Sequence, residues 1–362
     1  MTDSHINDIK WMKRAIYLAS LGKGRTSPNP MVGAVILDKN GNLISEGFHS
    51  KSGMPHAEAM AFNNLKKDAR DGTIYVNLEP CCHQGKTPPC VDKIISFGIK
   101  KVFVSIEDPD KRVSGKGIKL LEDAGIKVYQ GLCKKESQEL NKSFIYRNIT
   151  DNAFGVLKWA MSMDGRVGLK NGKSKWITNK DSRSLVHSYR ACFDAIIIGG
   201  STLRKDDPLL TSRGIRNPEP LRVVFTKTLD LPEKCNFWDF NLARTLVVYD
   251  GSFADKKYLK RIPEGIEIEE LSSDNPILLS NLLAKKGCNN VFWECGPKLA
   301  TSAMKAGCIQ ELMTFIAPKI LGGVSGMNPF SDFEFTDMDE VFDLNEPKIS
   351  FIGDDIFVKS NI

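Results

Sequence analysis

The sequence predicts two consecutive α/β domains, and three observations lead to this fold class. The chain has 362 residues, and at roughly 100–200 residues per domain this length suggests two domains. Short apolar segments typical of strands alternate with segments of helical periodicity. The alternation pauses at a polar segment around Thr150-Asp151-Asn152 and then begins again. We therefore expect one domain over residues 1–149 and a second over residues 150–362.

The first domain is expected to be a three-layer α/β domain that opens with an amphipathic helix. Ile9, Met12, Ile16 and Ala19 recur at helical spacing, and the helix should end near Gly22. Two strands joined by an Asn-Gly turn signal should follow. In order, we expect strands over 31–37 and 43–48, a helix over 56–65, a strand over 73–78, a helix over 91–97, a strand over 101–106, a helix over 117–124, a strand over 126–132 and a polar helix over 136–148.

The second domain repeats the alternation of strands and helices. Thr178 and Asp181 predict a capping box that opens a helix running to Arg190. We expect strands over 156–160, 195–198, 221–226, 245–249, 290–294 and 311–317, and further helices over 276–286 and 299–306.

Two glycine turns in this domain directly follow predicted strands. They are Gly199-Gly200-Ser201-Thr202 and Gly296-Pro297, and their backbone N–H groups are suited to an anion. Either turn alone is more typical of a structural turn, whereas the two together favour the binding of a dinucleotide. Neither matches Gly-x-Gly-x-x-Gly, which disfavours a Rossmann domain.

The composition is that of an ordinary globular chain. A hydrophobic content of 41% and a net charge of +6 exclude disorder and fibrous structure, and the small basic surplus argues against a nucleic-acid partner. No apolar run approaches the roughly 20 residues of a membrane span, and the first residues lack the apolar core of a signal peptide. Nine cysteines at irregular spacing indicate reduced thiols. We expect a cytoplasmic protein without a membrane partner.

A metal-ligand pattern lies in the first domain. His56-Ala57-Glu58 stands at the start of a predicted helix, Cys81 follows Pro80 after a strand, and Cys90 opens another helix. One imidazole and two thiolates form a three-ligand zinc set, whose open fourth position holds a water with a pKa of about 7. Glu58 would move protons without binding the metal. This combination is typical of zinc nucleobase deaminases.

The alternative is a closed structural zinc site completed by Cys82 or His83. A carboxylate two residues after a histidine ligand speaks against it. Residues two apart do not share a helix face, so His56 and Glu58 can serve one site only over the helix end. The segment 82–89 replaces the two residues found there in nucleic-acid-acting deaminases. Its Gly85-Lys86-Thr87 can donate to a phosphate, and the alternative is a solvated loop.

These motifs resemble the bifunctional deaminase-reductase family of riboflavin biosynthesis, and the likeness covers almost the whole chain. It rests on Ser27-Pro-Asn-Pro-Met-Val-Gly33, His56-Ala-Glu58, Glu79-Pro-Cys81 through Cys90, Ser162-Met-Asp-Gly-Arg166, Ser174-Lys-Trp-Ile-Thr178 and Asp206-Asp-Pro-Leu-Leu-Thr211. The resemblance implies a cytidine-deaminase-like first domain and a dihydrofolate-reductase-like second domain. Cys82 departs from the small hydroxyl residue expected there, so a competing ligand or an oxidation-prone thiol beside the metal stays open.

The activity implied by the resemblance has two steps. Zinc hydroxide deaminates 2,5-diamino-6-ribosylamino-4(3H)-pyrimidinone 5′-phosphate, and NADPH then reduces the ribosyl group to ribityl. One zinc ion per chain would be held by His56, Cys81 and Cys90, with Glu58 as proton shuttle. The implied ribotide contacts are Asn29, His49, Lys86 and Thr87. A homo-oligomer is expected.

The resemblance also places the reductase site. The implied cofactor-binding residues are Ala160, Trp176, Thr202, Asp206, Thr226, Gly296, Pro297, Lys298, Leu299, Ala300, Thr301 and Ser302. The implied substrate-binding residues are Ser174, Arg190, Leu210, Arg213 and Glu294, with Lys158 as a polar contact near the ribose. Arg190 and Arg213 suit a bidentate clamp on the phosphate. From the residues alone, Arg190 is equally well a solvated side chain, and Trp176 equally well a core residue.

Two further functions stay open at this point. One is a tRNA adenosine deaminase with an accessory domain, against which the segment 82–89 and the small basic surplus speak. The other is a non-catalytic scaffold that retains only structural zinc.

Overall fold

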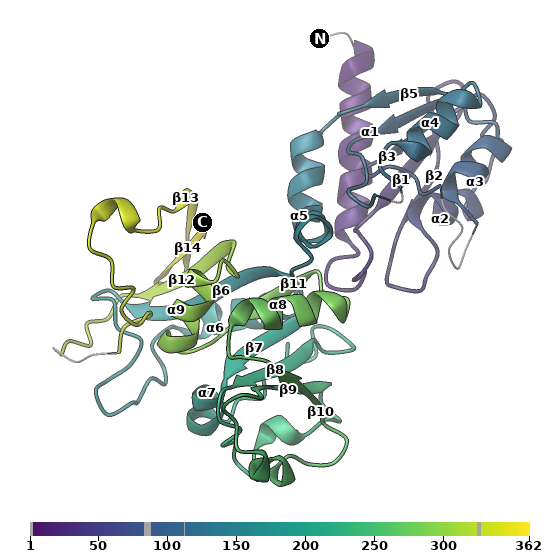
Figure 1. The fold of residues 1–362 in the computed structure, drawn as a ribbon. Helices are drawn as coiled ribbons and strands as arrows, with labels where there is room; N and C mark the ends of the chain where they lie inside the picture. The colour runs from purple at the N-terminus through teal and green to yellow at the C-terminus, as the bar shows by residue number, and fades with distance from the viewer. Residues whose placement is uncertain (1–2, 83–87, 112, 324–326) are drawn as a thin grey trace. The chain divides into compact units, whose positions relative to one another are not determined.

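The computed structural model describes residues 3–82, 88–111, 113–323 and 327–362 (Figure 1). It divides into two compact units, Met1–Thr150 and Asp151–Ile362. Each unit is built on its own β-sheet.

The first unit contains a five-stranded sheet in the order β2-β1-β3-β4-β5. β1 pairs antiparallel with β2 and β3, and β3, β4 and β5 are parallel. The strands are β1 (Gly33–Leu37), β2 (Leu43–Phe48), β3 (Thr73–Val76), β4 (Lys101–Val104) and β5 (Lys127–Gln130). The helices are α1 (Asp3–Ser20), α2 (Ala57–Asn63), α3 (Cys90–Ser96), α4 (Lys116–Asp123) and α5 (Lys134–Thr150).

Alternation along β1 gives this sheet two apolar faces. Val35 and Leu37 join a buried cluster with α1, whereas Ala34 and Ile36 join a second cluster with α2, α3 and α4. Successive strand side chains point to opposite faces, so a strand buried on both sides requires a helical layer on each. The predicted three-layer architecture is confirmed.

The second unit contains a nine-stranded sheet in the order β10-β9-β8-β7-β11-β6-β12-β14-β13. All pairs from β10 to β12 are parallel, and β14 and β13 continue the sheet as an antiparallel hairpin. The strands are β6 (Phe154–Ser162), β7 (Ala195–Gly199), β8 (Leu221–Thr226), β9 (Thr245–Asp250), β10 (Glu267–Leu271), β11 (Asn290–Trp293), β12 (Glu311–Ala317), β13 (Asn345–Ile352) and β14 (Asp355–Asn361). The helices are α6 (Lys180–Arg190), α7 (Gly200–Asp206), α8 (Pro276–Lys285) and α9 (Pro297–Lys305), with short 3₁₀ turns at Asn236–Trp238, Lys256–Arg261 and Met338–Glu340.

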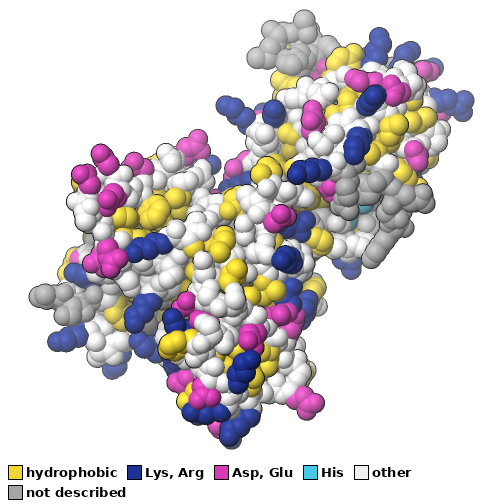
Figure 2. Space-filling view, viewed as in Figure 1, with side chains coloured by type: hydrophobic (Ala, Val, Ile, Leu, Met, Phe, Trp, Pro, Cys, Tyr) yellow, Lys and Arg dark blue, Asp and Glu magenta, His cyan; other side chains and the backbone are white. Residues whose placement is uncertain are grey.

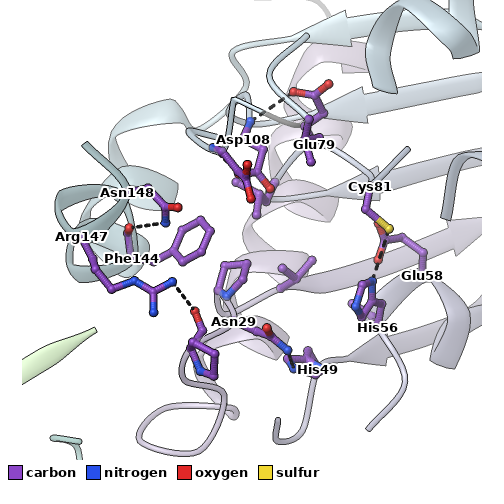
Figure 3. A pocket seen from close by; sticks show the side chains of 17 residues that line it. Asn29, His49, His56, Glu58, Glu79, Cys81, Asp108, Phe144, Arg147 and Asn148 are labelled. Atoms are coloured by element: carbon purple, nitrogen blue, oxygen red, sulfur yellow. Dashed lines mark hydrogen bonds between the residues drawn. The ribbon is translucent and has the colours of Figure 1, made fainter. Parts of the chain in front are cut away.

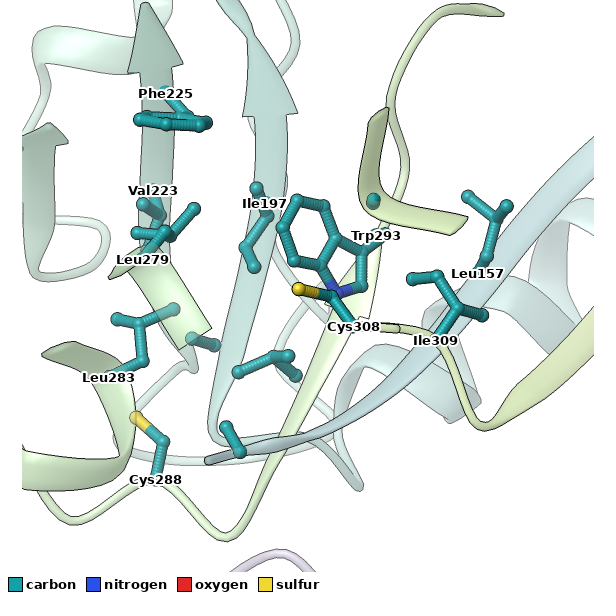
Figure 4. Packing of buried hydrophobic residues seen from close by; sticks show 14 of the residues in the cluster. Leu157, Ile197, Val223, Phe225, Leu279, Leu283, Cys288, Trp293, Cys308 and Ile309 are labelled. Carbon is teal, nitrogen blue, oxygen red and sulfur yellow. The ribbon is translucent and has the colours of Figure 1, made fainter. Parts of the chain in front are cut away.

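The main core of the second unit lies between this sheet and helices α8 and α9 (Figure 4). Leu157, Ile197, Val223 and Trp293 come from four neighbouring strands and belong to one buried cluster with Leu279 of α8. Parallel strands covered by helices are apolar along most of their length, which is why these strands could be recognised in the sequence.

Several elements differ from the sequence prediction. The predicted capping box is wrong by one residue, because the N-cap of α6 is Asn179 and not Thr178. The Asn179 side chain accepts a hydrogen bond from the backbone N–H of Ser182 at 2.8 Å. Strands β10, β13 and β14 were not predicted. The composition of β10 is rich in glutamate, and β13 is almost wholly exposed. The residues after Gly199 form helix α7 rather than a simple turn.

Charges of both signs are interspersed over the face of the molecule shown in Figure 2. Among the described residues, no helix combines the length and the hydropathy needed to cross a membrane.

Candidate active site

Three metal-binding side chains converge in the first unit. His56 is the N-cap of α2, Cys81 follows β3, and Cys90 is the first residue of α3. Their ligand atoms all lie within 4.8 Å of one another, and His56 Nδ1 is 3.5 Å from the Sγ atom of each cysteine. A zinc ion with Zn–N of about 2.0 Å and Zn–S of about 2.3 Å at tetrahedral angles places such atoms about 3.5 Å apart. The donor set therefore fits zinc in chemistry and in spacing.

Glu58 lies beside these donors in the first turn of α2 and is only 3% exposed. Because the cluster lies over the helix end, residues two apart face the same site, as the sequence required. Burial, together with the nearby Cys81 thiolate, raises the pKa of Glu58 to about 7. A carboxyl group with such a pKa can both accept and return a proton near neutral pH.

A cavity of about 250 Å³ adjoins the donor set (Figure 3). His56, Glu58 and Cys81 form one side of this pocket. This volume is slightly below the range of about 300–1,000 Å³ that is usual for ligand pockets. The cavity therefore suits a small molecule such as a single heterocycle with its substituent.

His49 and Asn29 form the floor of the pocket as drawn in Figure 3. His49 is 2% exposed, and burial lowers its pKa, so the ring is neutral. Its Nδ1–H donates to the carbonyl of Pro55 at 3.1 Å, which leaves Nε2 to accept from Asn29 Nδ2, also at 3.1 Å. This chain of contacts fixes the orientation of the Asn29 amide in the pocket.

Sequence reasoning missed the opposite wall. Phe144, Arg147 and Asn148 of α5 line the pocket, and their spacing of three and four residues places them on one helix face. Arg147 Nη2 donates to the carbonyl of Pro28 at 3.1 Å, so α5 also holds the segment that carries Asn29. The only sequence signal was this spacing within a helix that otherwise reads as polar.

Asp108 and Asp110 also line the pocket and were not predicted. Asp108 is 9% exposed, and burial raises its pKa to about 6. Both residues follow β4. Polar side chains just after a strand of a parallel sheet often reach a site at its carboxyl edge, and this was the available signal.

Three residues that the sequence predicts near the metal lie outside the described residues. They are His83, Lys86 and Thr87. Cys82 is described, and it packs against the apolar cluster of the first unit rather than joining the three-residue donor group. The closed zinc site completed by Cys82 is therefore not formed.

The second unit brings together Lys158, Arg190 and Glu294. Arg190 Nε and Nη2 contact the two carboxylate oxygens of Glu294 at 2.5 and 3.1 Å, and Lys158 Nζ is 3.8 Å from Oε2. The side chains of Arg190 and Glu294 are 13% and 9% exposed. Arg190 is therefore not a solvated surface side chain, and the Coulombic attraction of Glu294 raises its pKa against the effect of burial.

The two glycine turns meet at the same edge of the sheet. β7 and β11 are parallel neighbours, so their carboxyl ends lie side by side. A Cβ on Gly296 would stand 3.9 Å from Thr202 Oγ1, and one on Gly200 would stand 3.0 Å from Thr226 Oγ1. The helices α7 and α9 begin here, and the first N–H groups of a helix have no intrahelical partner.

The other predicted reductase residues come from several segments of the second unit. Trp176 is 63% exposed, with the Arg183 guanidinium 4.4 Å from its ring centre, which excludes a core role. Ala300 and Thr301 point inward, and Thr301 Oγ1 accepts from the backbone N–H of Ser331 at 2.9 Å. The remaining predicted residues are Ala160 on β6, Ser174 before α6, Asp206 on α7, Leu210 and Arg213 in the loop after α7, and Pro297, Lys298, Leu299 and Ser302 on α9.

Comparison with known proteins matches both halves of the chain. Residues 5–106 match the cytidine and deoxycytidylate deaminase zinc-binding region, and residues 153–358 match the RibD C-terminal domain. The riboflavin biosynthesis protein RibD of Synechocystis sp. is 40% identical over 97% of this chain and 95% of its own, and that of Aquifex aeolicus is 36% identical over 97% of each chain.

Solved structures show the same likeness over both units. RibD of Acinetobacter baumannii has a TM-score of 0.89 at 32% identity. A diaminohydroxyphosphoribosylaminopyrimidine deaminase/5-amino-6-(5-phosphoribosylamino)uracil reductase of Thermotoga maritima has a TM-score of 0.87 at 33% identity. Each comparison covers 99% of both chains. The predicted fold class is thus confirmed as a cytidine-deaminase-like domain followed by a reductase domain, and the chain belongs to the RibD family of bifunctional deaminase-reductases of riboflavin biosynthesis.

Proposed function

We propose that the first unit deaminates the pyrimidine ribotide at the pocket beside His56, Cys81 and Cys90, and that the second unit reduces the product at the Arg190–Glu294 edge of its sheet. The observation that carries the proposal is a zinc-compatible donor set with a buried carboxyl group and a small cavity on the same side. We assign residues 1–149 to the deaminase and residues 150–362 to the reductase.

In the deaminase, His56, Cys81 and Cys90 would hold one zinc ion. Zinc with three protein ligands supplies a water that loses its proton near neutral pH. Glu58 accepts a proton from the attacking water and returns it to the departing amino group. The carbon–nitrogen bond is thereby replaced by a carbon–oxygen bond, and ammonia leaves.

The other pocket residues bind and orient the substrate. Asn29, fixed by His49, contacts the ring. Lys86 and Thr87, which lie outside the described residues, are our proposed contacts with the ribotide phosphate. Asp108 and the side chains of α5 line the remaining walls of the pocket.

In the reductase, NADPH would lie over the adjoining starts of α7 and α9 and supply a hydride. Thr202 and Gly296 stand at this junction, where helix N–H groups favour phosphate. Glu294 holds Arg190 and Lys158 together, and our proposal is that these three side chains border the site of the phosphorylated ribosyl group. The remaining cofactor and substrate assignments from the sequence stand as proposals.

The test follows ammonia and NADPH separately when purified protein is mixed with the diaminopyrimidine ribotide. Ammonia should appear without NADPH, and NADPH oxidation should follow only after deamination. NADPH oxidation without prior ammonia release would contradict the proposed order of the two steps.

We further propose a homo-oligomer in the cytoplasm that acts on a small phosphorylated pyrimidine, without a nucleic-acid or membrane partner. The interspersed charges in Figure 2 lack the basic patch typical of nucleic-acid binding on the face shown. Salt-sensitive RNA binding would contradict this proposal.

A further inference from the structure

The carboxylate of Glu79 joins two parts of the deaminase pocket. Glu79 follows β3, stands two residues before Cys81 and is 3% exposed. Its two oxygens accept hydrogen bonds from four backbone N–H groups, those of Asp108 at 3.2 Å, Gly115 at 2.9 Å, Gly117 at 2.9 Å and Ile118 at 3.3 Å.

Three of these N–H groups belong to the start of α4. The N-cap of this helix is Gly115, which has no side chain to satisfy them. Glu79 supplies the cap from a different strand, and its negative charge is favourable at a helix N-terminus. Gly117 permits this close approach, because a Cβ there would lie 2.3 Å from the carbonyl oxygen of Pro80.

The fourth N–H group belongs to a wall of the pocket formed by Asp108, Asp110 and Val113, which we call the Asp108 wall. Figure 3 shows Glu79 and Asp108 next to each other at the rim of the pocket. Asp108 in turn accepts from the Asp110 backbone N–H at 2.9 Å. The Asp108 wall therefore takes its position from the Glu79 carboxylate.

We propose that Glu79 is a positioning residue for deamination that holds the Asp108 wall at a fixed distance from the metal donors and so sets the affinity for the pyrimidine. Glu79 also lines the pocket, but backbone N–H groups occupy both of its carboxylate oxygens, so its proposed action is through the wall. Cys81 is held independently by His56 and Cys90, so loss of the Glu79 bonds moves the wall more than the donors. This inference rests on the proposed deaminase function.

The first test is Glu79→Gln, which keeps the shape of the side chain. The glutamine amide has one oxygen, which can accept hydrogen bonds, and one NH₂ group, which can only donate. The backbone N–H groups around residue 79 therefore lose one of their two acceptor atoms. We expect the KM for deamination to rise about tenfold while kcat stays within about twofold, as for loss of uniform binding. The matched control is Glu122→Gln on the exposed side of α4, which removes the same charge and should leave KM unchanged.

The second test is Gly117→Ala, which leaves the carboxylate intact. The added Cβ would meet the Pro80 carbonyl and push α4 away from Glu79. The same rise in KM is expected, so the proposal does not depend on whether Glu79→Gln folds. For Glu79→Gln, zinc content and the reduction of the deaminated ribotide by NADPH should match those of the unaltered protein. Because the Pro80 carbonyl belongs to the peptide bond before Cys81, the KM of Gly117→Ala is measured on zinc-saturated protein.

Two results would overturn the proposal. One is an unchanged KM in both variants. The other is a fall in kcat or in zinc content at unchanged KM, which would place the effect of Glu79 on the metal donors. Failure of the unaltered protein to release ammonia from the ribotide is a separate result, because it would overturn the proposed function itself.

Discussion

Arg190 donates two parallel hydrogen bonds to the carboxylate of Glu294, from Nε at 2.5 Å and from Nη2 at 3.1 Å. One residue ends helix α6 and the other follows strand β11. Bidentate geometry of this kind orients a guanidinium as well as stabilising it. A third donor, Nη1, reaches the carbonyl of Thr211 at 3.2 Å, so Arg190 also holds the loop that carries the predicted substrate residues.

Glu294→Gln should therefore damage the reductase and leave the deaminase intact. Removing one partner of a buried ion pair leaves an uncompensated charge and costs about 3–5 kcal/mol. We expect a lower melting temperature for the second unit and a large loss of NADPH-dependent reduction. The control is Glu267→Gln, an exposed partner of Lys286, since exposed ion pairs contribute about 0–1 kcal/mol. Equal effects of the two substitutions would contradict the role given to Glu294.

Glu58→Gln should separate metal binding from proton transfer. The amide cannot accept and return a proton, so deamination should fall by about 10²–10⁴-fold. Zinc content, measured by atomic absorption, and the reduction of the deaminated ribotide should not change. Ammonia release at the unaltered rate would show that another group moves the proton.

The metal donors and most of the strands could be predicted from the sequence because their signals are local. His56 and Glu58 are two residues apart, and Cys81 comes shortly after a strand of strong apolar character. The far wall of the pocket could not be predicted in this way. Arg147 meets Pro28 across 119 residues of chain. The packing of α5 beside α1 and two hydrogen bonds between Asn141 of α5 and the backbone of Met31 bring them together.

The errors in the fold have physical reasons of the same kind. Asn179 and Thr178 are both good N-cap residues, and the structure selects Asn179 because Asp355 accepts from its backbone N–H at 2.8 Å. In strand β13 the apolar residues Ile349 and Phe351 alternate with polar ones over a short stretch only, and both side chains are exposed. β13 is held in the sheet by its antiparallel backbone pairing with β14, which its own composition does not reveal.

Removal of zinc should abolish deamination and spare reduction. The three donors belong to the first unit, whereas the Arg190–Glu294 edge belongs to the second. Without the ion, two thiols and an imidazole lose the partner that binds them together, and the first unit should also become less stable. After treatment with a chelator, ammonia release is measured with the diaminopyrimidine ribotide, and NADPH oxidation is measured separately with the deaminated ribotide. Loss of both activities at the same rate would contradict it.

The stability of the second unit should depend on pH through His187. Burial lowers the pKa of His187 below 6.5, with Arg190 and Arg213 acting in the same direction and Glu294 and the Thr211 carbonyl opposing them. Near and just below pH 6.5 the folded state then binds fewer protons than the unfolded state. The contribution of His187 to the free energy of unfolding is therefore largest above that pH and falls as the pH decreases. Thermal unfolding at pH 5.5 and 7.5 should show a smaller difference in melting temperature for His187→Gln than for the unaltered protein. An equal difference would show that His187 does not contribute.

Gly47→Ala should disturb the deaminase site through packing alone. A Cβ on Gly47 of β2 would lie 2.4 Å from the Ala57 carbonyl oxygen and 2.4 Å from the Ala61 nitrogen, both in the backbone of α2. Because Ala57 stands between His56 and Glu58, the helix cannot move away without displacing both. A shift of about 1 Å can cost about 10²-fold in rate, so we expect deamination and zinc affinity to fall together. Reduction by the same preparation is the internal control. Normal ammonia release with tightly bound zinc would show that α2 can shift while the donor geometry is retained.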